Sequence, residues 1–443
     1  MRKIADTREP GAVRIVVDDG EETGSEALAI HGHRVSVIAV FLVIATLYVI
    51  TLFVPDPSLH WAAEDEVCCH IPAIKAFQEK RLLETLQYYP SATTPLYHLL
   101  MALVFGRVDS DLLRIAWVVI TLAVGFLLYL HVRSDVSLRR RERAAVALAM
   151  AFLLSPTIRA SAVYFVTDGL AVHLALAGLV LLRRARPGSA TYVPLSASAI
   201  LLGYSSFYTR QYYLWATLYI AYNVFSDAAS KRAKLATMAG CLLLTAPAVG
   251  LFALWHALTP VNLPVHRQPA LLSTVPNALG LLAVYSLPLV WIAARDGARV
   301  LRQRTGGRPL LVSLLVVGGA AFYVATGLAL GFEIPSAGGI LRTVTIFGWF
   351  GDVLFLVVSY VGLVMLLRWL VIDGLWQLWW AAFLLPLLAG EILLQRYFEP
   401  AVIVFMFLAA RPGDALKVLQ SRLVWFYPLF AAVYALSRMI YFA

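Results

Sequence analysis

The sequence has few charged residues, few lysines and few cysteines. Only 14% of its 443 residues are Asp, Glu, Lys or Arg, whereas 60% are hydrophobic. That share of charge cannot cover the surface of a soluble globule of this length, so the composition indicates an integral membrane protein. Three cysteines, Cys68, Cys69 and Cys241, are too few for a disulfide framework. A bond between the adjacent Cys68 and Cys69 would be strained.

Several motifs typical of known chemistries are also missing. The chain has no Gly-rich loop for a phosphate, no Gly-x-Ser-x-Gly, and no Cys or His pairs at the spacing of a zinc site. It has no internal repeat either, which disfavours a transporter built from symmetric halves. We therefore expect that no cofactor is required, although three acids close to His70 leave a divalent cation open.

Apolar runs make up most of the chain, and their length of about 20 residues suits helices that cross a bilayer core of about 30 Å. We expect an all-α polytopic membrane protein, a bundle of about 13 transmembrane helices. The first two spans are expected at 35–54 and 112–132. Residues 1–33 are expected to be a disordered cytoplasmic tail, and residues 34–443 a single membrane domain.

One long polar segment interrupts this apolar chain, the predicted first extracytoplasmic loop at 55–111. Apolar side chains recur in it at roughly helical spacing, which predicts amphipathic helices on the membrane surface. Its apolar stretch 96–106 is too short to cross a bilayer, so we expect it to be interfacial or re-entrant. The loop also carries three consecutive acids, Glu64, Asp65 and Glu66, which are costly near a bilayer unless they face water or substrate.

Basic residues gather in short loops on one predicted side of the bundle, the side that also holds the N-terminus. By the positive-inside rule this side is cytoplasmic, and the 55–111 loop therefore faces outward. A net charge of +10 placed in this way indicates orientation, with nucleic acid a poor second explanation. The Arg-rich, Lys-poor composition favours a bacterial source and hence the bacterial inner membrane.

Single arginines remain on the outward side, where the general bias removes positive charge. An arginine among interfacial aromatic residues must reach water or bind an anion, and a lipid phosphate is the obvious anion at this surface. The candidate phosphate-binding residues are Arg210, Arg396, Arg342 and Arg267.

Asp65 and Glu66 are the candidate general bases. A base needs an ionised oxygen within hydrogen-bond reach of a hydroxyl, and a neighbouring acid can tune its pKa by like-charge repulsion. Alternatively, the acids only begin a surface helix and offset its dipole. His70 would share a helical face with Glu66, either as a substrate contact or as local structure. Asp168, close to Tyr164, would bind sugar or else cap the next helix.

Five stretches of the sequence together resemble a known family. They are DEVCCHIPAIKAF at 65–77, ATTPLYHLL at 92–100, VYFVTDG at 163–169, YTRQYYLW at 208–215 and QRYFEP at 395–400. In the same order they resemble segments of the GT-C class of polyprenyl-phosphate-sugar-dependent glycosyltransferases. The most similar member is the dolichyl-phosphate-glucose-dependent α-1,2-glucosyltransferase of N-glycan precursor assembly. One residue more than usual separates the acidic pair from His70, which leaves the base open between Asp65 and Glu66.

The resemblance implies a GT-C-like bundle and an inverting glycosyltransferase. It would move a hexose, with glucose favoured, from a polyprenyl-phosphate donor to a hydroxyl of a glycan or lipid-linked acceptor at the outer membrane face. A loop carboxylate would deprotonate the acceptor, and the arginines would stabilise the departing phosphate. No nucleic acid would take part. The residues expected to contact substrate are Glu64, His70, Tyr164, Asp168, Gln211, Trp215 and Tyr397.

Two other functions stay open. A lipid-linked saccharide or polyprenyl-phosphate transporter or flippase would bind phosphate with the same arginines and couple the acids to protons. The acids stand in a loop and not in the middle of a span, which weighs against it. A GT-C transferase of a pentose or an aminosugar to lipid A or a wall polymer would share the architecture and differ in its substrates.

Overall fold

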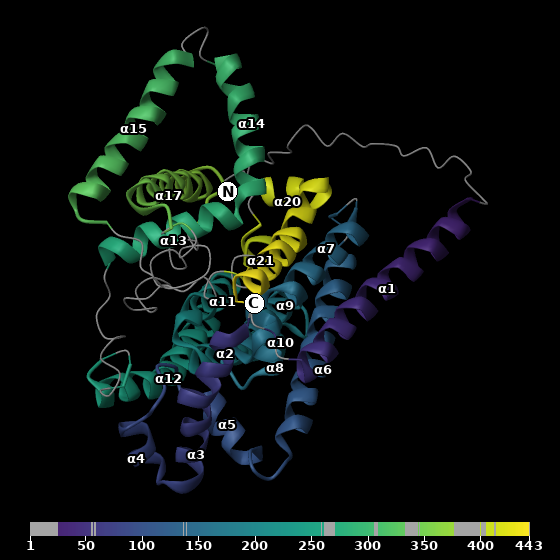
Figure 1. Ribbon diagram of the computed structural model, residues 1–443, viewed down its shortest axis with the longest axis vertical. Helices are drawn as coiled ribbons and strands as arrows, with labels where there is room; N and C mark the ends of the chain where they lie inside the picture. Colours follow the sequence, from purple (N-terminus) through teal and green to yellow (C-terminus); the bar gives the residue numbers. More distant parts are fainter. Residues whose placement is uncertain are drawn as a thin grey trace, which may run out of the picture. The chain divides into compact units, whose positions relative to one another are not determined.

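In the computed structural model, the described part of the chain is helical, and no strand occurs in it (Figure 1). One isolated bridge joins Phe105 and Val108. The chain divides into two units, Met1–Thr46 and Leu47–Ala443, and each is described by itself. The structure describes residues 25–54, 56, 59–135, 137–138, 140–257, 259–260, 271–304, 309–332, 344, 346–375, 399, 405–411 and 413–442.

Short helices follow the first long one. Helix α1 extends over Ser25–Phe53, so it begins inside the tail predicted at 1–33, of which residues 1–24 lie outside the described part. The loop predicted at 55–111 then contains α2 (His60–Asp65), the π-helical turn η2 (Glu66–His70), α3 (Ile71–Glu79), α4 (Leu82–Gln87) and α5 (Leu96–Val104). The predicted helices are therefore present, and their place on a membrane surface stays a prediction. The nine residues of α5 reach about 14 Å, which is too short to cross a bilayer.

Longer helices make up the rest of the described chain. They are α6 (Ser110–Arg133), α7 (Arg141–Leu154), α8 (Pro156–Val163), α9 (Asp168–Arg184), α10 (Tyr192–Thr209), α11 (Leu214–Asp227), α12 (Lys231–Trp255), α13 (Leu271–Tyr285), α14 (Leu287–Arg304), α15 (Pro309–Ala329), α17 (Gly348–Val371), α20 (Gly413–Gln420) and α21 (Phe426–Phe442). Three single turns stand between them, η3 (Gln211–Tyr213), η6 (Phe405–Ala410) and η7 (Arg422–Trp425).

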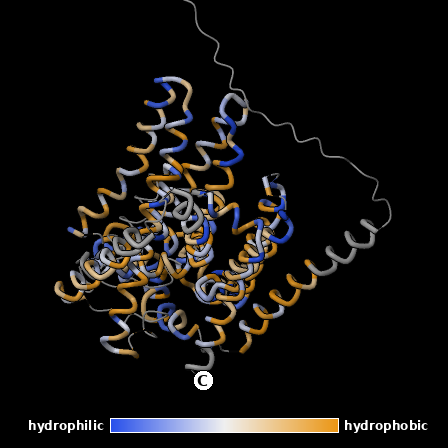
Figure 2. The backbone as a smooth tube through the Cα atoms, turned by 90° about the horizontal axis from the view of Figure 1, so that it is seen from above, coloured by the Kyte–Doolittle hydropathy of each residue, from blue (hydrophilic) through white to orange (hydrophobic). Residues whose placement is uncertain are grey.

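Three of these helices, α6, α12 and α17, are long and apolar enough to cross a membrane. The pairs α7 with α8 and α13 with α14 also pass when each is taken together, but they are bent by 57° and 78°. Figure 2 shows apolar residues along much of the helical chain. The described residues thus support a helical membrane protein with three to five candidate spans, and not the bundle of about 13 that the apolar runs predicted. The predicted number of about 13 spans is too high for the described residues, because several apolar runs fold into helices that are short or bent.

Helix α6 shows how the sequence sets the ends of a span. The side chain of Asp109 accepts hydrogen bonds from the backbone N–H groups of Asp111 and Leu112, at 2.8 and 3.1 Å, and so caps the first turn. The helix ends at Arg133, where a cation offsets the negative end of the helix dipole. The helix predicted at 112–132 is confirmed as a candidate span, with two additional residues at its start and one at its end.

The bend between α7 and α8 brings polar groups into the interior. The Ser155 side chain accepts from the backbone N–H of Ile158 at 3.4 Å, and Pro156 occupies the first helical position, where a missing N–H costs nothing. Every residue of α8 is buried, including Thr157 and Arg159. Because a buried cation or hydroxyl needs partners, this helix is a place to look for a polar site.

Candidate active site

Segments that are far apart in the sequence meet around η2. The backbone N–H of Phe165, in the turn before α9, donates to Glu66 Oε2 at 3.3 Å. The Gln211 side-chain amide donates to the carbonyl oxygen of Ala92 at 2.7 Å, which ties η3 to the loop before α5. Four of the five stretches that carry the family resemblance therefore lie in one neighbourhood.

Glu66 has its carboxylate engaged inside this neighbourhood. Its side chain is 3% exposed, and Arg114 Nη2 on the first turns of α6 donates to Oε1 at 2.5 Å. The same guanidinium lies 5.3 Å from the centre of the Phe165 ring. Both carboxylate oxygens therefore have donors, one from Arg114 and one from the Phe165 backbone. Glu66 anchors η2 to α6, and its oxygens are occupied by protein groups.

The two preceding acids are more accessible. Glu64 is 66% exposed on its side chain and pairs with His60 Nε2 at 3.0 Å. Asp65 ends α2 and is partly exposed. The helical stretch continues through η2 into α3, so these acids lie beyond its first turn. The alternative that they begin a helix and offset its dipole is therefore wrong.

A buried ion pair joins α9 to the end of α10. Arg210 Nε and Nη2 donate to the two oxygens of Asp168, each at 3.0 Å, and the Tyr212 hydroxyl donates to Oδ1. The side chains of Arg210 and Asp168 are 7% and 1% exposed. Thr167, at the N-cap of α9, makes no side-chain capping hydrogen bond. The Asp168 carboxylate accepts hydrogen bonds from Arg210 and Tyr212 and does not cap the helix. Both residues were predicted to bind substrate, and the structure brings them together as partners of each other.

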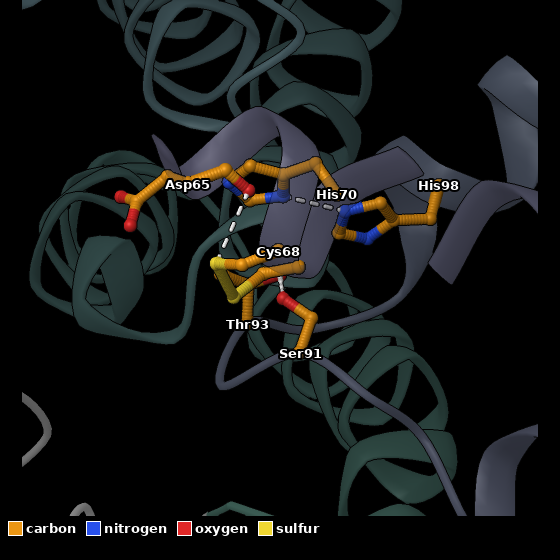
Figure 3. Close-up of a disulfide and its surroundings, with 7 residues drawn as sticks. Asp65, Cys68, His70, Ser91, Thr93 and His98 are labelled. Carbon is orange, nitrogen blue, oxygen red and sulfur yellow. Dashed lines mark hydrogen bonds between the residues drawn. A yellow bond between two sulfur atoms is a disulfide. The ribbon is translucent and has the colours of Figure 1, made fainter. Parts of the chain in front are cut away.

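Two histidines and a tyrosine form a second buried group. His70 Nδ1 and His98 Nε2 lie 2.7 Å apart, and the Tyr89 hydroxyl is hydrogen-bonded to His98 Nδ1. The imidazole planes are stacked, with centroids 5.0 Å apart (Figure 3). Burial and the neighbouring His70 and Arg210 hold the pKa of His98 well below its usual value, so His98 is neutral.

Figure 3 also shows the disulfide that joins Cys68 to Cys69 within η2. We expected adjacency to disfavour this bond, and the structure contains it. It lies between Asp65 on one side and the two imidazoles on the other. Cys241, on α12, is a free thiol.

The remaining predicted substrate contacts lie at the edges of this neighbourhood. Tyr164 ends α8 half-buried and packs against a cluster that includes Leu59. Burial and then the charge of Glu66 raise the pKa of its hydroxyl. Trp215 is buried on α11, edge-on to the Phe405 ring at 4.6 Å. The described part of the chain provides no hydrogen-bond partner for the Trp215 indole N–H.

Sequence analysis missed several buried polar residues. Asp56 forms an ion pair with Arg159 on α8, and both side chains are at most 6% exposed. Thr157, on the same helix, donates to Glu399 Oε2 at 3.2 Å. Burial raises the pKa of Glu399 to about 7. A lone charge inside an apolar run is the signal that marks Arg159.

The opposite end of α6 holds a separate group of charges. Arg133 Nε is 2.8 Å from Glu142 Oε2, and Asp135 pairs with Arg183 and Arg411. Arg114 and Glu66 lie near the start of this 24-residue helix, and these pairs lie at its end, where Arg133 is about 28 Å from Arg114 along the helix. Among the residues described, no group of three or more His, Cys, Asp or Glu is arranged to hold a metal ion.

Four of the predicted residues, Arg267, Arg342, Arg396 and Tyr397, lie outside the described residues. The chain matches no family model, no curated protein and no solved structure.

Proposed function

We propose that the protein is an inverting glycosyltransferase that moves a hexose, with glucose favoured, from a polyprenyl-phosphate donor to a hydroxyl of a glycan or lipid-linked acceptor. One observation supports this above the others. The stretches at 65–77, 92–100, 163–169 and 208–215, which resemble the GT-C transferases, are joined around η2 by hydrogen bonds. A chance likeness of scattered motifs would give no reason for them to meet.

Asp65 is the proposed general base. Glu66, the other candidate, already accepts from Arg114 and from the Phe165 backbone, whereas Asp65 is adjacent and partly exposed. In the proposed reaction Asp65 takes the proton of the acceptor hydroxyl, and the acceptor oxygen forms a bond to the anomeric carbon. The bond between that carbon and the lipid-phosphate oxygen breaks, and the phosphate leaves with the electron pair. Attack from the opposite side inverts the anomeric configuration.

The developing charge on the phosphate needs fixed cations. We assign this role to Arg267, Arg342 and Arg396, the other three arginines that the sequence predicts on the outward side. Arg210 serves the site differently, because its bidentate bond to Asp168 fixes η3 against α9. Exposed Glu64, half-buried Tyr164 and the residues of η3 would then border the sugar and acceptor.

The proposed place of the site is the extracytoplasmic end of a GT-C-like bundle, in a bacterial inner membrane. Support comes from the two ends of α6 and α9. Glu66, Arg114 and Asp168 lie at one end, while Arg133 and Arg183 belong to the other. Since the end rich in basic residues is expected to face the cytoplasm, we place the site end on the outer side.

Purified protein offered a panel of short-chain polyprenyl-phosphate hexoses tests this proposal. We expect the wild type to transfer one of them, and Asp65→Asn to reduce turnover by about 100-fold or more. Glu66→Gln is the matched control, since it keeps an acceptor for Phe165 and changes mainly stability. Turnover in EDTA decides whether a divalent cation takes part. Transfer of only a pentose or aminosugar would favour that GT-C alternative, and phosphate-lipid translocation without any glycosidic product would favour the transporter.

A further inference from the structure

The end of α6 that lies away from Glu66 gathers several guanidinium groups around one carboxylate. Asp135, just after the end of α6, pairs with Arg183 in the last turn of α9 and with Arg411, which follows η6. Helix α9 contacts both α6 and η6, so three segments meet at this carboxylate. We call Asp135, Arg183, Arg411 and the adjacent Arg184 the arginine cluster.

Arg411 uses its guanidinium inside the protein. Its Nε donates to the carbonyl oxygen of Phe407 at 3.0 Å, its Nη1 donates to the Ser137 hydroxyl at 3.3 Å, and its Nη2 donates to Asp135 Oδ2. Its backbone has a left-handed φ of 39°, and its N–H donates to the carbonyl oxygen of Met406 at 3.1 Å. Because each guanidinium nitrogen has an acceptor, Arg411 balances the charge of Asp135 and fixes η6 to the turn after α6.

Arg183 lacks such a set of acceptors. Its Nη1 lies 3.9 Å from Asp135 Oδ2, which is too far for a hydrogen bond. No hydrogen bond of its guanidinium occurs in the described part of the chain, and its side chain is 27% exposed. The charge of Arg411 also acts on Arg183. Asp135 is shared with Arg411, so the charge of Arg183 is only partly balanced and its N–H donors can reach a ligand.

Arg184 adds an exposed cation beside Arg183. The charges of Arg183, Arg184 and Arg411 all act on His131 in the last turn of α6, which gathers the three guanidinium groups in one region. Asp227, at the end of α11, is another carboxylate in this region, and it forms no ion pair with the cluster in the described structure. The arginine cluster therefore has more cations than carboxylates to balance them.

The arginine cluster lies at the depth expected for lipid phosphates. Helix α6 is a candidate span of 24 residues, about 36 Å long, whereas the hydrocarbon core of a bilayer is about 30 Å thick. The turn after its end at Arg133 therefore belongs to the headgroup region. Guanidinium groups bind phosphate by paired, charge-assisted hydrogen bonds. Basic pockets between membrane helices on the cytoplasmic side are typical sites for anionic headgroups.

We propose that Arg183 and Arg184 bind the phosphate of an anionic phospholipid at the surface of the membrane. Arg183 donates hydrogen bonds to the phosphate, Arg184 adds a second positive charge, and Arg411 stays on Asp135 as a structural link. A zwitterionic headgroup carries its own cation and fits the surplus of positive charge less well. Inorganic phosphate has the same acceptor oxygens but no acyl chains to hold it at this depth. This inference does not depend on the proposed transferase activity.

Native mass spectrometry of the full chain, released from a neutral detergent, counts bound lipids and tests this proposal. We expect the wild type to retain phosphatidylglycerol in preference to phosphatidylcholine, and millimolar inorganic phosphate to leave the bound phosphatidylglycerol in place. Arg183→Gln and Arg184→Gln should each weaken phosphatidylglycerol binding by about 10-fold, because each removes a charged partner of the phosphate. Arg183→Lys keeps the charge and should lose less. The matched control is Arg232→Gln, which removes an exposed arginine of α12 outside the cluster and should bind as the wild type does.

Melting temperatures in lipid-free detergent separate binding from folding. Arg184 is exposed and has no ion pair in the described part of the chain, so Arg184→Gln should melt as the wild type does. If Arg183→Gln melts lower without lipid, the binding result of Arg184→Gln decides alone. Phosphatidylglycerol affinity that these variants leave unchanged, or that Arg232→Gln lowers equally, would overturn the lipid site. Displacement of the lipid by inorganic phosphate would also overturn it and would indicate a site for a soluble anion.

Discussion

Breaking the Asp168–Arg210 pair should destabilise the protein strongly. The pair is bidentate with both bonds at 3.0 Å, and its side chains are 1% and 7% exposed. Removing one partner of such a pair leaves an uncompensated buried charge and costs about 3–5 kcal/mol. Asp168→Asn removes the carboxylate charge that binds the Arg210 guanidinium, and Arg210→Met removes the guanidinium and leaves the Tyr212 hydroxyl as a donor to the carboxylate. We expect each single variant to lose about 3–5 kcal/mol of unfolding free energy.

The double variant Asp168→Asn/Arg210→Met isolates the interaction. Because both charges are gone, its loss of unfolding free energy should be smaller than the sum of the two single losses, by about 1–3 kcal/mol. Denaturant titration in a mild detergent, followed by tryptophan fluorescence, measures all four proteins. Lys80→Met is the matched control. Lys80, which follows α3, pairs with Glu84 of α4 at 4.0 Å, both side chains are about half exposed, and the pair should contribute less than about 1 kcal/mol.

Two results would refute this reasoning. One is single variants that lose no more unfolding free energy than Lys80→Met, which would mean that the ion pair is solvated in the folded protein. The other is a double variant whose loss equals the sum of the single losses, because additivity excludes coupling between the two side chains.

Two further predictions concern packing and pH. A Cβ on Gly362 of α17 would lie 2.0 Å from the carbonyl oxygen of Leu279 on α13. Gly362→Ala should therefore lower the free energy of unfolding by about 1–3 kcal/mol. Gly240→Ala on α12 adds a Cβ where no atom lies within 4 Å, so it should leave the free energy of unfolding unchanged or raise it. Equal effects of Gly362→Ala and Gly240→Ala would contradict the contact between α13 and α17. Glu399 has its pKa raised from 4.5 to about 7 by burial, so the folded state holds its proton more tightly. Stability should fall as pH rises across that interval, and a Glu399→Gln protein that keeps the same pH dependence would contradict this.

The sequence predicted single helices well where one apolar run coincides with one helix. The span expected at 112–132 is α6, because Asp109 and Arg133 mark its ends. The apolar run at 141–163 is different, because it forms two helices, α7 and α8, and not one. Ser155 and Pro156 bend that run by 57°, and hydropathy alone does not register such a bend.

The candidate site was predicted residue by residue but not as pairs. Asp168 and Arg210 were both selected for chemistry, yet their contact across 42 positions depends on how α9 packs against α10. Arg114 and His98 were missed, since Arg114 follows Asp111 at i,i+3 spacing and His98 stands in an apolar stretch, and each gains meaning only beside Glu66 or His70. Local pattern identifies polar residues in a membrane chain, whereas their partners depend on tertiary packing.

The most direct test of the proposed transferase activity is the anomeric configuration of the product. Wild-type protein is incubated with short-chain polyprenyl-phosphate glucose of one defined anomer and an acceptor alcohol, and the product is examined by proton NMR while released lipid phosphate is quantified. The account predicts one free lipid phosphate for each new glycosidic bond, with the opposite anomeric configuration, and loss of both signals in Asp65→Asn. Retained configuration, or turnover that Asp65→Asn leaves unchanged, would contradict it.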